Sequence, residues 1–164
     1  MQAISARNED QAIYGVSLSS ADDSIIARAM EILFARVQQG EAMSSPAAVK
    51  QWLQLKIGGY EHEMFGIMFL DVQNRLIRFE EMFRGTLTQT SVYPREVVKA
   101  AIQCHAAAVV LTHNHPSGST QPSRADEALT QTLKAALALV DVRVLDHIIV
   151  SQTGALSMAE KGLC

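Results

Sequence analysis

A short apolar run at residues 107–111 leads directly into two histidines that are two residues apart, His113 and His115. An apolar run of this length, with two valines and a leucine, indicates a buried β-strand. On a strand, residues i and i+2 point to the same face, so both imidazoles could bind one ion from one side. Asp126 follows eleven residues after His115, across a loop with proline, serine and glycine that could turn its carboxylate back to the same ion. Two imidazoles and one carboxylate, with a fourth position left for water, form the ligand set of a catalytic zinc centre.

The spacing of these residues is similar to a known signature. His-x-His, seven residues, a serine, two residues and an aspartate is the pattern of the JAMM (MPN+) metalloproteases, and the serine here is Ser123. Further segments resemble the RadC family of bacterial JAMM-domain proteins: FRGTL at 83–87, YPREVV at 93–98, HNHPSG at 113–118 and VLDHIIV at 144–150. The resemblance extends over residues 45–162. It implies an α/β fold of the JAMM/MPN (cytidine-deaminase-like) type, with three layers α/β/α around a mixed central sheet, and Zn²⁺ held by His113, His115 and Asp126.

A hydrolytic zinc site also needs a base, because the proton of the attacking water must reach the leaving amine. Glu63 is the first candidate, since it precedes the apolar run 64–70 and the sequence EMFG at 63–66 resembles the Glu-x-x-Gly context of the JAMM glutamate. Glu61 is the alternative, because on a strand it would point to the same face. Without the downstream histidines, both glutamates would be read as solvated charges at the start of a strand.

Two interpretations are open for each of three polar residues: Ser123, Asp126 and His147. Ser123 and Asp126 resemble a capping box at a helix start, which is compatible with metal binding by Asp126. The Ser123 hydroxyl could cap the helix, donate a hydrogen bond to the reacting carbonyl oxygen, or do both. His147 lies in an otherwise apolar strand, where a partner of a metal ligand or a satisfied core histidine is favoured over a fourth ligand.

Helical and strand patterns alternate along the chain, which predicts an α/β class with a mixed sheet. We expect an N-terminal extension at residues 1–44 with one helix, from Asp22 to a stop at Gly40, and a RadC-like JAMM/MPN domain at residues 45–164. In the second helix, from Ser45 to the glycines at 58 and 59, Trp52 and Leu55 are predicted to face inward. The remaining predicted elements are a hairpin at 64–70 and 76–79, a strand at 86–92, a helix from Pro94 to Ile102, the strand at 107–111, a helix at 123–140 and a strand at 142–150.

Composition limits the cellular setting and the partners. The formal charge is −3 and the pI is near 5.9, so nonspecific nucleic-acid binding, which needs a basic surface, has no support from composition, although a local basic groove stays open. Two cysteines provide no disulfide framework, and neither a signal peptide nor a membrane segment is apparent. We therefore expect a cytoplasmic protein without a membrane partner. The oligomeric state is left open, a homo-oligomer included.

The sequence therefore predicts a zinc-dependent metallopeptidase that hydrolyses a peptide or isopeptide bond in a protein or peptide substrate. The alternative is a non-catalytic binding module with a zinc site, associated with DNA repair or mobile elements. A metal-dependent nuclease would be expected to use Mg²⁺ and more carboxylates. Full-length RadC proteins carry a helical N-terminal segment, and the 44 residues before Ser45 are too few to hold it. The resemblance therefore does not carry a nucleic-acid role of that segment over to this chain, and nucleic acid as a partner is left open.

Overall fold

The computed structural model of the protein describes residues 20–38, 46–85 and 91–164. Its centre is a sheet of five strands: β1 (Met64–Leu70), β2 (Leu76–Arg84), β3 (Ala108–Asn114), β4 (Arg143–Ser151) and β5 (Gly154–Ser157). Their order in the sheet is β2-β1-β3-β4-β5. Neighbouring strands are antiparallel except β3 and β4, which are parallel. The mixed sheet predicted from the sequence is thus confirmed.

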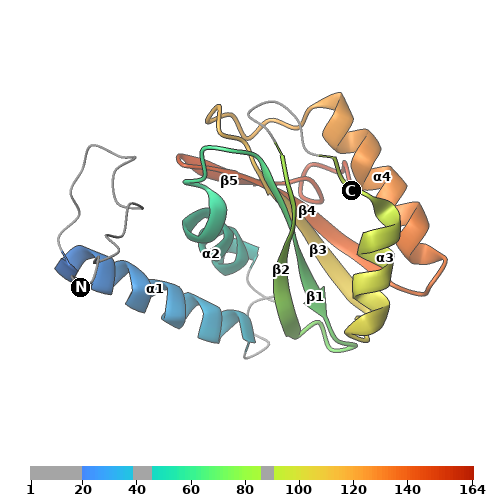
Figure 1. The fold of residues 1–164 in the computed structure, drawn as a ribbon, viewed down its shortest axis with the longest axis horizontal. Coiled ribbons are helices and arrows are strands. Elements are labelled where there is room, and N and C mark those ends of the chain that lie inside the picture. Colours follow the sequence, from blue (N-terminus) through green and yellow to red (C-terminus); the bar gives the residue numbers. More distant parts are fainter. Residues whose placement is uncertain (1–19, 39–45, 86–90) are drawn as a thin grey trace, which may run out of the picture.

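Helices cover both faces of the sheet (Figure 1). On one face lies α2 (Pro46–Ile57), with α1 (Ser20–Gln38) on its outer side; on the other face lie α3 (Pro94–Gln103) and α4 (Arg124–Ala138). Two large apolar cores result, one between α2 and the sheet and one between the sheet and the pair α3 and α4. The described residues also include a small buried cluster of Ile149, Leu156 and Met158. β1 and β3 are buried along their whole length because both of their faces are covered. The three-layer α/β/α arrangement is as predicted.

The second helix has the predicted bounds, but one predicted core residue is wrong. Trp52 is buried, whereas Leu55 is 48% exposed. The buried stripe of α2 is completed by Val49, Leu53 and Ile57, which recur at the i, i+4, i+8 spacing of one helix face. Leu55 lies six residues after Val49, and this turns its side chain away from that face.

The hairpin is longer than predicted, because β2 continues from Leu76 to Arg84. A tight turn at Asp71 joins the two strands: the Asp71 amide donates to the Arg75 carbonyl at 3.0 Å, and the Asn74 amide donates to the Asp71 carbonyl at 2.9 Å. The strand predicted at 86–92 falls largely outside the described residues, and its described part, at 91 and 92, is not a strand. The short strand β5 was not predicted.

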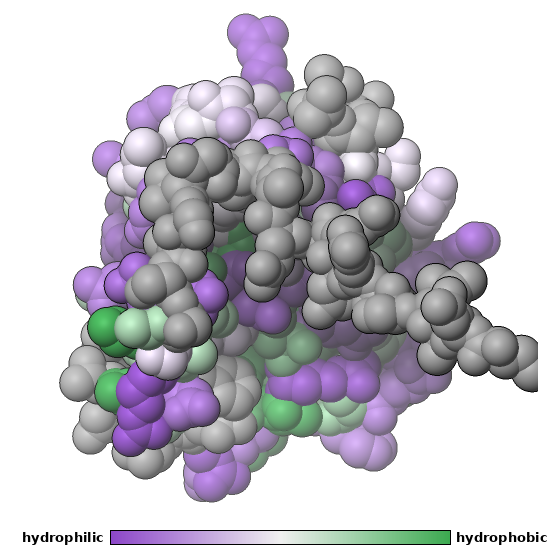
Figure 2. All heavy atoms as spheres, turned by 60° about the vertical axis from the view of Figure 1, so that its left-hand side comes forward, coloured by the Kyte–Doolittle hydropathy of each residue, from purple (hydrophilic) through white to green (hydrophobic). Residues whose placement is uncertain are grey.

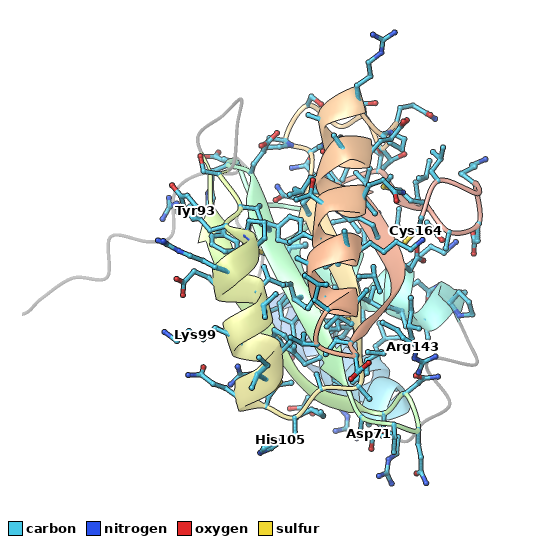
Figure 3. All side chains as sticks on the ribbon, turned by 90° about the vertical axis from the view of Figure 1, so that its right-hand side faces the viewer. Asp71, Tyr93, Lys99, His105, Arg143 and Cys164 are labelled. Atoms are coloured by element: carbon cyan, nitrogen blue, oxygen red, sulfur yellow. The ribbon has the colours of Figure 1, made fainter. Side chains whose placement is uncertain are left out.

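The helices are arranged differently on the two faces of the sheet: α3 and α4 both lie on the sheet, whereas α1 lies outside α2. Figure 3 shows α3 and α4 side by side over the sheet, with Tyr93 at the start of α3 and His105 just past its end. On the side that carries α1, hydrophobic residues are interspersed with hydrophilic ones (Figure 2). No helix in the described part of the chain is long and apolar enough to cross a membrane.

Candidate metal centre

The two histidines of the His-x-His pattern lie at the carboxyl end of β3, next to the start of α4. His113 is the penultimate residue of the strand and is buried, and His115 follows the strand and is half-buried. As predicted from the period of a strand, both rings point to the same face, and their Nε2 atoms lie 2.9 Å apart. The Phe65 ring, from the neighbouring strand β1, is stacked beside His113 with the ring centroids 6.3 Å apart. This contact limits the rotation of the His113 ring.

Asp126 brings its carboxylate to the two histidines from the first turn of α4. Its Oδ1 atom lies 3.2 Å from His113 Nε2, and its Oδ2 atom lies 3.6 Å from His115 Nε2. Donor atoms about 2.0–2.1 Å from a tetrahedral zinc ion are about 3.3 Å from one another. The three separations seen here, from 2.9 to 3.6 Å, bracket that value. The three side chains predicted from the sequence thus form one group that could hold a metal ion.

The charges of the group favour a cation. Burial alone would raise the pKa of Asp126, but the hydrogen bonds it shares with His113 and His115, and with Ser123, hold that pKa far below its usual range. The hydrogen bond to Asp126 raises the pKa of His115, more than burial lowers it. The carboxylate is therefore ionised, and the site attracts positive charge, either a proton or a metal ion.

In His113 and His115, the ring nitrogen that faces away from the metal group, Nδ1, has a hydrogen-bond partner of its own. His115 Nδ1 donates a hydrogen bond to the Ser119 carbonyl at 2.8 Å, so its Nε2 carries a lone pair when the ring is neutral. His113 Nδ1 lies 2.7 Å from Nε2 of His147. Outer partners of this kind orient a metal-ligating imidazole and determine which nitrogen is protonated.

His147 lies behind His113 and not at the site itself. Its ring is completely buried, and burial, together with the neighbouring His113, lowers its pKa well below the ordinary value, so the ring is neutral. Its Nδ1 atom lies 2.6 Å from Thr130 Oγ1. The interpretation of His147 as a buried partner of a ligand agrees with this position.

Glu63 lies immediately before β1, at the same edge of the sheet. In the antiparallel register of β1 and β3, Phe65 is paired with His113, so extending the register by two residues places Glu63 opposite His115. Its charge is also one of the causes that raise the pKa of His115. Glu61 is exposed and lies before the strand begins. Glu63 also precedes β1, and the choice of Glu63 over Glu61 as the base stays a prediction.

Comparison with known proteins gives a family. A family model described as the RadC-like JAB domain matches residues 43–163. The chain belongs to the RadC-like JAB domain family. A UPF0758 protein of Acidovorax sp. (strain JS42) is 65% identical over 140 residues, which are 85% of this chain and 59% of the relative. A UPF0758 protein of Polaromonas sp. (strain JS666) is 61% identical over 85% of this chain and 62% of the relative. The chain thus spans about three fifths of the length of these relatives.

In this RadC-like JAB domain, Ser123 is the N-cap of α4 and forms the predicted capping box with Asp126. The Ser123 hydroxyl donates to Asp126 Oδ2 at 2.7 Å and accepts a hydrogen bond from the Asp126 amide at 3.2 Å. The Ser123 amide also donates to Oδ2, at 2.7 Å. Ser123 thus orients the carboxylate that faces the histidines, and its contact with a reacting carbonyl stays a prediction.

Three residues around the centre of the RadC-like domain were not singled out from the sequence. Thr130 lies one turn after Asp126 on α4, so its position on the same helix face was a usable signal. Asn114 lies between the two histidines and points to the opposite face of the sheet, where it contacts the segment that carries Glu63. Ser119 contributes only its backbone carbonyl, and the identity of a side chain gives no signal for such a contact.

Proposed function

We propose that this RadC-like JAB domain is a zinc-dependent metallopeptidase that hydrolyses a peptide or isopeptide bond in a protein or peptide substrate. The observation that supports this most is the convergence of His113, His115 and Asp126 at the separations of tetrahedral zinc ligands. No other group of three such side chains is found in the described part of the chain. Three protein ligands leave one tetrahedral position open, as catalytic zinc sites do.

Each side chain of the site would have a different role in this reaction. When bound, Zn²⁺ lowers the pKa of water and polarises a carbonyl group. Glu63, opposite His115, would accept the proton of the attacking water and transfer it to the leaving amine. The Ser123 hydroxyl would donate a hydrogen bond to the oxygen of the reacting carbonyl as negative charge develops there.

A binding module with a purely structural zinc ion fits the site less well. Structural zinc sites almost always have four protein ligands, usually with cysteine among them, whereas the metal group here has three and no cysteine. A glutamate beside the ligands has no function in a closed site. A nuclease that uses Mg²⁺ would be expected to present oxygen ligands, and two of the three ligands here are imidazoles.

The decisive experiment compares Glu63→Gln with Glu61→Gln in the zinc-loaded protein. Both variants and the wild type are incubated with a peptide library and with a set of isopeptide-linked peptides, and the products are identified by mass spectrometry. We expect Glu63→Gln to retain zinc and to lose at least about 10²-fold in hydrolysis, and Glu61→Gln to cleave as the wild type does. The proposal is overturned if the zinc-loaded wild type cleaves nothing, or if neither substitution changes the rate.

A further inference from the structure

A buried line of hydrogen bonds connects two of the three metal ligands behind the site. His113 Nδ1 lies 2.7 Å from His147 Nε2, and His147 Nδ1 lies 2.6 Å from Thr130 Oγ1. The Thr130 hydroxyl donates to the backbone carbonyl of Asp126 at 2.6 Å. Thr130 and His147 are completely buried, and His113 is 6% exposed. The line therefore begins at one metal ligand, on β3, and ends at another, on α4.

The backbone carbonyl of Asp126, at the end of this line, determines which atom donates in each of its hydrogen bonds. A carbonyl oxygen only accepts, so the single hydroxyl proton of Thr130 points to Asp126. The Met158 sulfur at 3.8 Å is a weaker acceptor, and a proton turned to His147 Nδ1 would leave the Thr130 and Asp126 oxygens 2.6 Å apart with no proton between them. The Thr130 oxygen then has only lone pairs to offer His147. Nδ1 of His147 must therefore carry the proton of that ring.

The same reasoning continues to the metal ligand. His147 is completely buried, and its two ring nitrogens face an imidazole and a hydroxyl, so a charged ring would have no carboxylate beside it. The neutral ring with its proton on Nδ1 has a lone pair on Nε2, which can only accept. His113 must then donate from Nδ1, so in the neutral ring its Nε2 atom carries a lone pair. That lone pair points to Nε2 of His115 and to Asp126, where the metal would be held. A proton on Nε2, hydrogen-bonded to Asp126, makes the ring an imidazolium, and a metal ion would replace that proton. The backbone carbonyl of α4 thus determines the tautomer of a ligand on β3.

We propose that Thr130 and His147 are positioning residues that fix His113 in its metal-binding tautomer and connect it to the helix that carries Asp126. This inference rests on the proposed zinc site, and not on the reaction or its substrate. Phe65 supports the same geometry from the side, since its ring is stacked beside His113 and meets His147 edge-on, with centroids 5.7 Å apart. The rings therefore have little freedom to rotate, and the protons determine what His113 presents to the ion.

Thr130→Val tests the hydrogen bond between Thr130 and His147. Valine keeps the shape of threonine but removes the acceptor for His147 Nδ1, so that ring can hold its proton on Nε2 instead. His113 would then have to accept on Nδ1 and would direct an N–H into the site, which opposes metal binding. Loss of an outer partner of a ligand typically weakens metal affinity by about 10–100-fold. We expect a weakening of this size, measured by competition with a chromophoric zinc chelator.

The chain offers a matched control and a rescue. Thr132 also donates to the carbonyl four residues earlier on α4, that of Ala128 at 2.8 Å, but it is exposed. Thr132→Val should therefore leave zinc affinity unchanged. Thr130→Ser keeps a hydroxyl at the critical position and should bind zinc close to the wild-type level. Circular dichroism establishes that each variant is folded before its affinity is compared.

Nitrogen-15 NMR of the zinc-loaded wild type reads the tautomers without any substitution. We expect Nδ1–H for both His113 and His147. A proton on Nε2 of His147, zinc affinity in Thr130→Val equal to the wild type, or an equal loss in Thr132→Val would each overturn the inference while leaving the zinc site in place. A wild type that takes up no zinc would instead remove the proposed function together with this inference.

Discussion

The side chain of Asn114 accepts a hydrogen bond from the backbone amide of Met64, at 2.7 Å, across fifty positions of sequence. Its amide group also donates to the carbonyls of His62, at 3.0 Å, and Tyr60, at 3.2 Å. Asn114 is completely buried, so these three bonds hold the backbone on both sides of Glu63. The residue between the two candidate metal ligands therefore positions the candidate base.

Asn114→Ala should reduce turnover without removing the metal. The substitution leaves the Met64 amide and two carbonyls without this partner, so the segment that carries Glu63 is held less firmly relative to His115, although the Gly85 amide still donates to the Glu63 carbonyl at 2.8 Å. A displacement of about 1 Å at a reacting group costs on the order of 10²-fold in rate. We expect a fall in kcat of this size, with zinc content, measured by plasma mass spectrometry, equal to that of the wild type.

Asn114→Asp separates the hydrogen bond that Asn114 accepts from the two that it donates. The carboxylate keeps an acceptor for Met64 but places an oxygen against two carbonyls that need donors, so the loss of turnover should persist. Zinc lost in step with turnover in these variants would show that Asn114 acts on the ligands. Full turnover in Asn114→Ala would show that Glu63 needs no such support.

His113→Ala should empty the metal site. The wild type is expected to bind about one zinc ion per chain, and the variant close to none, because one ligand of three is gone. Zinc should also raise the melting temperature of the wild type but not that of His113→Ala, since a ligand that binds only the folded state stabilises it. His105→Asn is the control: His105 is exposed and has a φ of 54°, a conformation that asparagine tolerates. Stoichiometric zinc in His113→Ala would refute the ligand assignment.

Patterns of a few residues, together with the resemblance to the JAMM signature, were sufficient to predict the three side chains of the metal group. The alternation of a strand places His113 and His115 on one face, and a helix cap places Asp126 at the start of α4. The contacts of Asn114 and of His147 with Thr130 join residues that are distant in sequence, so they depend on how β3 lies against β1 and on how β4 lies against α4. No periodicity encodes those arrangements. The sequence therefore predicted the metal group but not the residues that hold its surroundings.

The register of α2 provides a test of packing. Leu53 is completely buried, whereas Leu55, which was predicted to face inward, is 48% exposed. Leu53→Ala should lower the free energy of unfolding by about 2–5 kcal/mol, because it removes buried methyl groups and leaves a cavity. Leu55→Ala should change it by no more than about 0.5 kcal/mol. Urea unfolding of the two variants measures the difference, and equal losses would mean that α2 presents a different face to the sheet.

Ser123→Ala separates the cap from the chemistry. The hydroxyl donates to Asp126, but the Ser123 amide donates to the same oxygen, so Asp126 keeps one donor if the hydroxyl turns to a substrate. The variant should therefore retain zinc. Loss of the cap should cost roughly 1 kcal/mol in the free energy of unfolding, whereas loss of an oxyanion donor should lower turnover by about 10²–10³-fold.

We expect both effects in Ser123→Ala, with turnover measured well below the melting temperature so that the modest loss of stability does not contribute. Ser123→Thr is the matched variant, because threonine retains a hydroxyl that can cap α4 and donate to the carbonyl. It should recover most of the stability and part of the turnover. Near-normal turnover in Ser123→Ala would leave the residue with one function, to cap α4 and orient Asp126.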